Sequence, residues 1–388
     1  MIAMPAARPI SFQNQPEGRF DRHALISWWD QEKLSRARVI VAGAGALGNE
    51  VLKLLALTGV GQITLVDYDR VSPSNLSRTV LFGPEDIGRP KVEAAAAKLK
   101  TLNPEVQLHP VQGDLRFDLS LAEYQAADIV IGCLDSVNAR WALNRRCQLA
   151  GVEWVDGGIS DHHGLVARYS PSSGACYECN FTAQTIERFN RRYSCPFGLV
   201  SGEPGAPVPT TAVTTSAVAA LQVQQALLWL HQAEQDALRP GERVLLYLKP
   251  FAMVKDLLPF NPDCMAHQRL PREIPALPCN YESTVDEVLA AARELHPGVT
   301  ALELPYDLVT RFTCPTCGQE EAVNRPKELV LQEEARCPGC GESRIPETTA
   351  ALNGVQPYGS LRLKDIGVPA GEILFFRKNS EQMFAKLM

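Results

Sequence analysis

Two stretches of this chain decide its fold: Val39-Ile-Val-Ala-Gly43-Ala-Gly45-Ala-Leu-Gly48-Asn-Glu50 and Ile63-Thr-Leu-Val-Asp67-Tyr-Asp69. They predict an apolar strand that runs into a turn with three spaced glycines, then a helix, and then a second strand that ends on carboxylates. In such a unit, backbone N–H groups at the helix N-terminus approach a phosphate, and the acid after the second strand binds ribose hydroxyls. Taken alone, the unit indicates a dinucleotide-dependent dehydrogenase.

Strand-like and helix-like stretches alternate from Arg38 to about Ala167. This alternation predicts an α/β fold of the Rossmann type, with a mostly parallel sheet and helices on both faces. The strands are predicted at Val39–Ala42, Ile63–Val66, Val106–Pro110, Ile129–Cys133 and Trp154–Val155, and the main helices at Val92–Lys100 and Ala139–Ala150.

Shifts in composition divide the chain into a large and a small unit. The stretch Arg269-Leu-Pro-Arg-Glu-Ile-Pro-Ala-Leu-Pro278 is rich in proline and reads as a linker. We predict a flexible arm at 1–18, a main domain at 19–268, a linker at 269–283 and a small C-terminal domain at 284–388. The main domain is expected to begin with a short helical lead-in at Arg19–Lys33, and the small domain with a helix at Thr284–Leu295.

The overall charge and the apolar runs exclude two classes of partner. With 38 basic and 44 acidic residues the net charge is −6, which argues against nucleic acid. The longest apolar run, Ala212–Leu230, is interrupted by threonines and glutamines, so a buried helix is expected and not a membrane span. No charged-then-apolar leader follows Met1, and the 11 cysteines favour metal binding in a reducing compartment. We therefore expect a cytoplasmic protein.

The residues that follow the second strand do not suit a dehydrogenase. Arg78, Lys91 and Asp135 supply two cations and an acid around the glycine turn. Such a set suits a triphosphate with Mg²⁺, because cations spread charge on phosphoryl oxygens and a carboxylate holds the metal. A dinucleotide carries a diphosphate and needs no metal. The chain also lacks the G-x-x-x-x-G-K-[ST] pattern of P-loop enzymes.

Over roughly Arg19 to His267, these ordered motifs resemble the ubiquitin-activating superfamily, which includes the bacterial ThiF, MoeB and HesA adenylyltransferases. The resemblance implies a homodimer that uses ATP and Mg²⁺ to adenylate the C-terminal carboxylate of a ubiquitin-like or sulfur-carrier protein ending in Gly-Gly. It also implies a crossover loop at about 180–211. Thr79 stands where many relatives carry glutamine.

The resemblance assigns a role to each residue of the expected nucleotide site. Gly43, Gly45 and Gly48 approach the phosphates, Asp67 binds the ribose together with Asp69, and Asp135 holds Mg²⁺. Arg78 and Lys91 bind phosphates, and Asn75 supports them. In Arg19-Phe-Asp-Arg22-His, the second arginine, Arg22, would reach across the dimer into the partner's ATP site.

Two groups of cysteines have the spacing of structural zinc sites. Cys176-Tyr-Glu-Cys179 and Cys264-Met-Ala-His267 offer three thiolates and one imidazole; alternatively, Cys195 or Cys279 completes this set in place of His267. Cys314-Pro-Thr-Cys317-Gly and Cys337-Pro-Gly-Cys340-Gly form a zinc-ribbon signature, in which the glycines permit tight turns. We expect two zinc ions per chain.

Cys195 is the candidate nucleophile. In ubiquitin-activating relatives a catalytic cysteine on the crossover takes the carrier as a thioester, and here Arg191 and Arg192 favour the thiolate. A buried thiol or a zinc ligand is the alternative role of Cys195. Cys133 and Cys147 are predicted to be core residues, and Cys279 is an alternative acceptor.

Four functions therefore remain open. The first is an activating enzyme that passes its carrier as a thioester on Cys195 to a conjugating enzyme. The second is an adenylyltransferase of a ThiS- or MoaD-like sulfur carrier without an enzyme thioester. A zinc-ribbon adaptor with a relic nucleotide fold and a dehydrogenase are weaker, because Arg78, Lys91 and Asp135 are all present.

Overall fold

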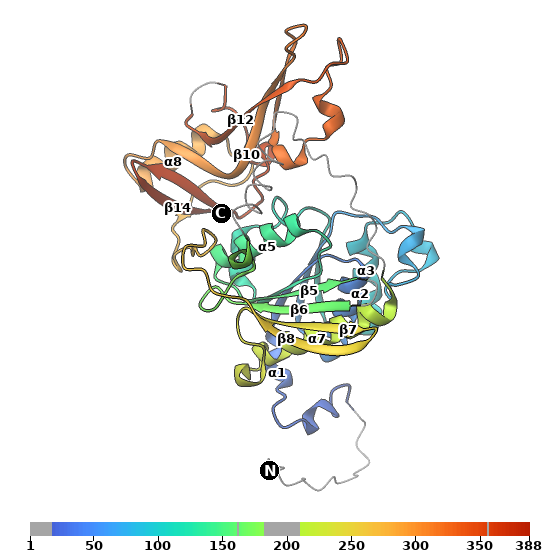
Figure 1. The fold of residues 1–388 in the computed structure, drawn as a ribbon. Helices are drawn as coiled ribbons and strands as arrows, with labels where there is room; N and C mark the ends of the chain where they lie inside the picture. Colours follow the sequence, from blue (N-terminus) through green and yellow to red (C-terminus); the bar gives the residue numbers. More distant parts are fainter. Residues whose placement is uncertain (1–17, 161–162, 182–209, 355–356) are drawn as a thin grey trace.

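The computed structural model describes residues 18–160, 163–181, 210–354 and 357–388. Its larger sheet has eight strands in the order β3-β2-β1-β4-β5-β6-β7-β8 (Figure 1). The pairings from β3 to β5 are parallel, and those from β5 to β8 are antiparallel. The strands are β1 (Arg38–Ala42), β2 (Gln62–Val66), β3 (Gln107–Val111), β4 (Ile129–Gly132), β5 (Trp154–Ile159), β6 (His163–Tyr169), β7 (Glu242–Leu248) and β8 (Phe251–Leu257).

Helices cover both faces of this sheet, because its central strands are apolar on both sides. Val39 and Val41 of β1 pack into one core with α2, α3 and α7, whereas Ile40 and Ala42 pack into a second core with α4 and α5. The helices are α1 (Gln31–Arg36), α2 (Ala46–Thr58), α3 (Lys91–Leu102), α4 (Leu121–Ala126), α5 (Val137–Ala150) and α7 (Ala212–Leu230). In the described part of the chain, no helix combines the length and hydropathy that crossing a membrane requires.

The C-terminal unit is built on a second sheet of six strands. Its order is β11-β10-β13-β14-β9, and β12 pairs with the long strand β10. Helix α8 buries Val285, Val288 and Leu289 against this sheet. The elements are β9 (Ala276–Leu277), α8 (Val285–Leu295), β10 (Ala301–Thr313), β11 (Glu320–Pro326), β12 (Ile345–Leu352), β13 (Ile373–Lys378) and β14 (Glu381–Leu387).

A buried ion pair joins the two units beside α5. Arg146 of α5 donates from Nη2 to Oε2 of Glu372 at 2.9 Å, and both side chains are nearly buried. The other oxygen of Glu372 accepts from the backbone N–H of Leu121 at 2.8 Å and of Ile373 at 2.9 Å. Figure 1 shows the C-terminal unit stacked on the side of the large sheet that α5 covers. The carboxylate of Glu372 is therefore saturated with donors from both units.

The sequence-based fold is confirmed, with three differences, which concern the strands β6 to β8, the helical lead-in and the linker. The predicted strands and helices form with shifts at their ends, and α7 has the predicted bounds. The antiparallel strands β6, β7 and β8 were not predicted. The reason is clearest in β8, which lies at the sheet edge and exposes apolar side chains such as Phe251, so its sequence does not alternate.

The predicted helical lead-in at Arg19–Lys33 is wrong in its extent. Within this stretch His23–Leu25 form the short 3-10 helix η1, and α1 begins only at Gln31, where Asp30 caps it. Within the proline-rich stretch 269–283, Ala276 and Leu277 form β9, which pairs with β14. The domain boundaries themselves stay predictions, and the predicted arm lies almost wholly outside the described residues.

The ion pair Arg146–Glu372 generates a prediction for stability. Arg146→Ala leaves a buried carboxylate without its cation, and we expect it to lower the free energy of unfolding by about 3–5 kcal/mol in a urea titration. Arg36→Ala is the matched control, because the Arg36–Glu32 pair is exposed at 77% and 72%. Equal unfolding midpoints for the two variants would show that the pair does not stabilise the docked units.

Candidate functional site

The turn between β1 and α2 brings the end of the strand very close to the first turn of the helix. The N–H of Gly43 donates to the carbonyl of Val66 at 2.8 Å, and Gly43 has a φ of +98°, which favours glycine. A Cβ on Gly48 would lie 2.0 Å from the carbonyl oxygen of Gly43. A Cβ on Gly45 would meet nothing within 4 Å, so this face of the turn is open at the start of α2. The turn therefore leaves space at the N-terminus of α2, which is the kind of position that binds phosphate.

Asp67 lies at the end of β2, beside this turn. Its Oδ2 accepts from the N–H of Ala44 at 2.7 Å, and its Oδ1 accepts from the N–H of Asp69 at 2.8 Å. Burial raises the pKa of Asp67, although the positive charge of Lys91 acts in the opposite direction. The carboxylate is thus held rigidly at the position that binds a ribose in folds of this type.

Lys91 is the first residue of α3 and is only 7% exposed. Its Nζ lies 2.6 Å from Oδ2 of Asp69, whose side chain is 52% exposed. The structure therefore brings Lys91 together with Asp67 and Asp69, which come from a separate motif. A largely buried ammonium with one partially exposed partner has capacity to bind further negative charge.

Carboxylates gather around the exposed side chain of Tyr68. Partial burial raises the pKa of Tyr68, and the negative charges of Asp69, Asp135, Asp67 and Asp114 raise it further. Asp135 is exposed and lies three residues after the end of β4. Negative charge is therefore concentrated at the carboxyl ends of neighbouring strands around Tyr68.

Asp114 belongs to this group and was missed by the sequence analysis. Burial would raise its pKa, but a bidentate ion pair with Arg116, at 2.8 and 2.7 Å, lowers it overall. It follows β3 closely, and the N–H of Gly113 donates to the carbonyl of Asp67 at 3.3 Å. Its place after a strand of the parallel sheet was a usable signal, because the carboxyl ends of such strands share one edge.

Asn49 connects the segment that carries Asn75 and Arg78 to the glycine turn. This fully buried amide donates to the carbonyls of Ala44 at 2.8 Å and Gly45 at 3.1 Å, and accepts from the N–H of Leu81 at 2.9 Å. Its role was also missed by the sequence analysis.

Asn75 and Arg78 are held within their own turn. Asn75, in the 3-10 helix η2 (Pro73–Asn75), accepts from the N–H of Ser72 at 2.9 Å. Arg78 donates from Nη1 to the carbonyl of Ser74 at 2.6 Å. Neither residue contacts Lys91 or Asp135 through a hydrogen bond among the described residues, so their phosphate roles stay predictions.

Arg140 fixes the loop that carries Asp135. Its guanidinium donates to the carbonyl of Leu134 at 2.5 Å, to that of Gly157 at 3.0 Å, and to the buried carboxylate of Asp156 at 3.0 Å. From the other face, the buried amide of Gln222 on α7 donates to the carbonyl of Gly132 at 2.9 Å. Asp135 is therefore carried on a loop that is braced on both faces of the sheet.

Arg22 lies far from the nucleotide site of its own chain. Arg19 donates to the carbonyl of Leu102 at the end of α3, and a Cβ on Gly59 would lie 2.6 Å from the ring of Phe20. The lead-in thus packs at the C-terminal end of α2, whose 13 residues separate it from the glycine turn. A helix of that length spans about 20 Å.

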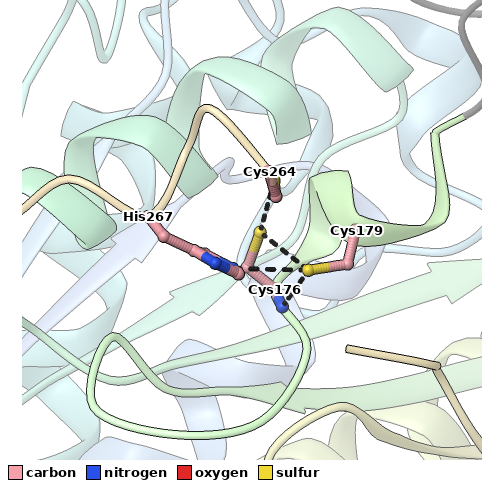
Figure 2. Close-up of side chains that lie close together, drawn as sticks. All are labelled: Cys176, Cys179, Cys264 and His267. Atoms are coloured by element: carbon pink, nitrogen blue, oxygen red, sulfur yellow. Dashed lines mark hydrogen bonds between the residues drawn. The ribbon is translucent and has the colours of Figure 1, made fainter. Parts of the chain in front are cut away.

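The first predicted metal set is assembled in space. Cys176, Cys179, Cys264 and His267 offer one ligand atom each, and these atoms all lie within 4.8 Å of one another. Figure 2 shows the three sulfurs and the imidazole converging from two segments far apart in the sequence. A hydrogen bond from Cys176 lowers the pKa of Cys179 to about 5. Three thiols and one imidazole in this arrangement fit a structural zinc ion.

The second set is Cys314, Cys317, Cys337 and Cys340, whose sulfurs also lie within 4.8 Å of one another. Gly318 and Gly341 follow the two pairs with φ of +71° and +77°, which confirms the turns expected after each pair. Their N–H groups donate to the carbonyls of Cys314 and Cys337 at 2.9 and 2.8 Å. This set also fits zinc.

Three of the remaining cysteines are core residues, and the fourth lies outside the described residues. Cys133 and Cys147 are buried in the two cores of the large domain, as predicted. Cys279 is buried in the core of the C-terminal unit, which removes it both as the alternative zinc ligand and as an acceptor. Cys195 lies outside the described residues, as does most of the predicted crossover loop. Its role as the nucleophile therefore stays a prediction.

Comparisons with known proteins show which family the large unit resembles. The model of the ThiF family matches residues 20–265. The SAMP-activating enzyme E1 of Haloferax volcanii is 33% identical over 256 residues, which cover 63% of this chain and 87% of that protein. The molybdopterin-synthase adenylyltransferase of Salmonella typhimurium is 36% identical over 165 residues, 42% of this chain and 66% of that protein.

A solved structure supports the fold. The crystal structure of E. coli MccB with ATP has a TM-score of 0.53 at 23% identity and covers 65% of this chain and 74% of that one. At this identity the likeness concerns the fold alone.

The contact between Gly48 and Gly43 generates a prediction for binding. Gly48→Ala forces α2 away from β1 and displaces the N–H groups of the turn, so we expect MgATP binding to weaken about tenfold or more in calorimetric titration. Gly158→Ala is the control, because its Cβ would have no neighbour closer than 3.6 Å. Equal dissociation constants for both variants would contradict a phosphate site at this turn.

Proposed function

Because the chain belongs to the ThiF family of ATP-dependent adenylyltransferases, we propose that it is an activating enzyme for a ubiquitin-like protein. It adenylates the C-terminal carboxylate of this carrier and then takes the carrier as a thioester on Cys195, from which a conjugating enzyme receives it. The observation that carries the adenylation step is the buried ammonium of Lys91 beside Asp69 and the open glycine turn.

The nucleotide site supports the first step. Asp67 binds the ribose, the N–H groups of the turn and Lys91 bind phosphates together with Arg78, and Asp135 holds Mg²⁺ beside Asp69. A carboxylate oxygen of the carrier attacks the α-phosphorus in line, and the bond to the β-phosphate breaks as pyrophosphate leaves. The protein contributes positioning and neutralisation of charge.

The second step needs a nucleophile. The thiolate of Cys195 attacks the acyl carbon of the adenylate, a thioester bond forms, and AMP leaves with the electron pair of the broken C–O bond. Free thiols of this kind suit a reducing compartment, so we assign the protein to the cytoplasm.

The exposed strand β8 is the proposed docking surface for the apolar face of the carrier. Phe251, Met253 and Leu257 are 77%, 54% and 49% exposed. The pairings Gly164–Ile159, His163–Tyr247 and Phe251–Leu248 carry Phe251 to the same edge of the sheet as the glycine turn. We propose that a carrier seated on β8 extends its tail along this edge toward Asp135.

The position of Arg22 supports a homodimer with shared sites. Arg22 is exposed at the C-terminal end of α2, so within its own chain it lies far from the phosphates. A partner chain would bring its Arg22 to this chain's site. The two metal sets hold zinc and stabilise the knuckle and the small ribbon, which have few apolar residues to bury.

The second candidate is adenylation of a sulfur carrier without an enzyme thioester. It is favoured by the likeness to a molybdopterin-synthase adenylyltransferase. Both candidates use the same ATP site, and only the fate of the adenylate differs.

The two steps are tested with a small protein that ends in Gly-Gly and co-purifies with this chain. We expect Lys91→Ala and Asp135→Ala to lower carrier-dependent ATP–pyrophosphate exchange about a hundredfold or more, because charge neutralisation in the transition state is lost. Lys98→Ala, on the exposed side of α3, is the control. Cys195→Ala should retain exchange and lose the carrier adduct that added thiols cleave by thioester exchange. If the adduct persists in that variant, Cys195 is not the acceptor; a thiocarboxylated carrier formed with sulfide supports the second candidate instead.

Mixing two inactive variants tests the shared site. Arg22→Ala and Asp135→Ala chains should each be inactive, but their heterodimer holds one intact site with Arg22 from one chain and Asp135 from the other. We expect exchange to recover to roughly a quarter of the wild-type rate, the share expected for random re-pairing with one working site in half of the dimers. A mixture that stays inactive would mean that Arg22 does not act across a dimer.

A further inference from the structure

Helix α5 contacts the first metal set near its middle and carries the loop of Asp135 at its N-terminal end. It begins one residue after Ser136, which follows Asp135 and caps the helix by accepting from the N–H of Ala139 at 3.1 Å. Near the middle of the helix, Asn144 and Arg145 point toward the knuckle formed by residues 176–179. The same rigid helix therefore links two sites that the proposed function treats separately.

Asn144 contacts the knuckle through both ends of its amide. Its Nδ2 donates to the sulfur of Cys176 at 3.6 Å and to Oε1 of Glu178 at 3.0 Å, and its Oδ1 accepts from the N–H of Tyr177 at 3.3 Å. The side chain is fully buried. An N–H donor to a ligand sulfur stabilises the thiolate form and fixes the orientation of the ligand.

Glu178 lies between the two cysteines of the knuckle and is only 7% exposed. Besides Asn144, it accepts from Nε of Arg145 at 3.1 Å and from Nη2 at 3.0 Å. The guanidinium of Arg145 lies 4.4 Å from the ring centroid of Trp141 on the same helix. The ion pair between Glu178 and Arg145 thus holds the knuckle against α5. Because the carboxylate of Glu178 is largely buried, removal of its cation costs free energy.

The N-terminal end of α5 holds the loop that carries Asp135. Arg140 of this helix binds the carbonyl of Leu134 at 2.5 Å, one residue before Asp135. A shift or tilt of α5 would therefore move the loop that carries Asp135.

We propose that Asn144 is an outer-sphere residue of the first metal set and that Glu178 holds it in place, and that through them the metal-bound knuckle anchors α5 and so positions Asp135 for MgATP. This inference rests on the zinc assignment in the proposed function and adds positioning residues that act through the metal ligands and Asp135. It makes nucleotide affinity depend on a metal that does not touch the nucleotide.

The test measures zinc release from the full-length protein into a coloured chelator. The two metal sets should release zinc in separate phases, and Cys314→Ser identifies the phase of the ribbon. We expect Asn144→Ala and Glu178→Ala to release zinc from the knuckle about ten times faster or more and to leave the ribbon phase unchanged. In zinc-loaded protein, MgATP should bind about two- to thirtyfold more weakly, as expected for indirect positioning.

The matched control is Gln148→Ala, which shortens a buried amide one turn further along α5 whose Nε2 has no hydrogen-bond partner in the described part of the chain. It should change neither quantity. In cobalt-substituted protein, Asn144→Ala should also shift the sulfur-to-cobalt charge-transfer band, which a merely structural loss would not move, and Gln148→Ala should not.

Each outcome contradicts either the roles of Asn144 and Glu178 or the zinc assignment on which they rest. Wild-type release rates in both knuckle variants would overturn the outer-sphere assignment. Faster release with unchanged MgATP affinity would overturn the link to Asp135. If the wild-type knuckle binds no zinc, the zinc assignment of the proposed function fails instead. Glu178→Ala keeps the test decisive if Asn144→Ala does not fold.

Discussion

The close approach of α2 to β1 is the constraint on which the nucleotide site depends. A Cβ on Gly48 would lie 2.0 Å from the carbonyl oxygen of Gly43, so only glycine allows the helix to start beside the strand end. This contact directs the N–H groups of the first helical turn to the edge of the sheet where parallel strands end. Asp67, Lys91, Asp135 and the unpredicted Asp114 all lie at that edge, because each follows a parallel strand or begins the helix after one.

Polar contacts on α5 hold the rest of the molecule to this site. Arg140 braces the loop of Asp135, Asn144 and Arg145 bind the metal knuckle, and Arg146 binds Glu372 of the C-terminal unit. Most of these side chains are buried or nearly so, where an unpaired partner costs much more free energy than at the surface. The helix therefore acts as a common support for parts of the chain that are distant in sequence.

Local sequence signals predicted elements whose pattern is strong within a few residues. The glycine spacing, the acid after the second strand and the four Cys-x-x-Cys or Cys-x-x-His pairs are of this kind, and the structure assembles both metal sets from them. Strand β8 escaped prediction because its apolar residues face outward at an edge. Asn49 and Gln222 escaped because a glutamine or asparagine in a helix gives no sign of the distant carbonyl it will bind.

The sequence by itself determined the fold class, the glycine turn, the identity of the acids and cations of the site, and the metal-ligand pairs, since each depends on residues adjacent along the chain. Only the tertiary structure decided that His267 and not Cys279 completes the first set, since Cys279 is buried in the other core. It also decided that Lys91 pairs with Asp69, that Arg22 lies far from its own site, and that α5 connects metal and nucleotide. These facts depend on which strand ends and helix faces meet in space, and spacing along the chain does not encode that.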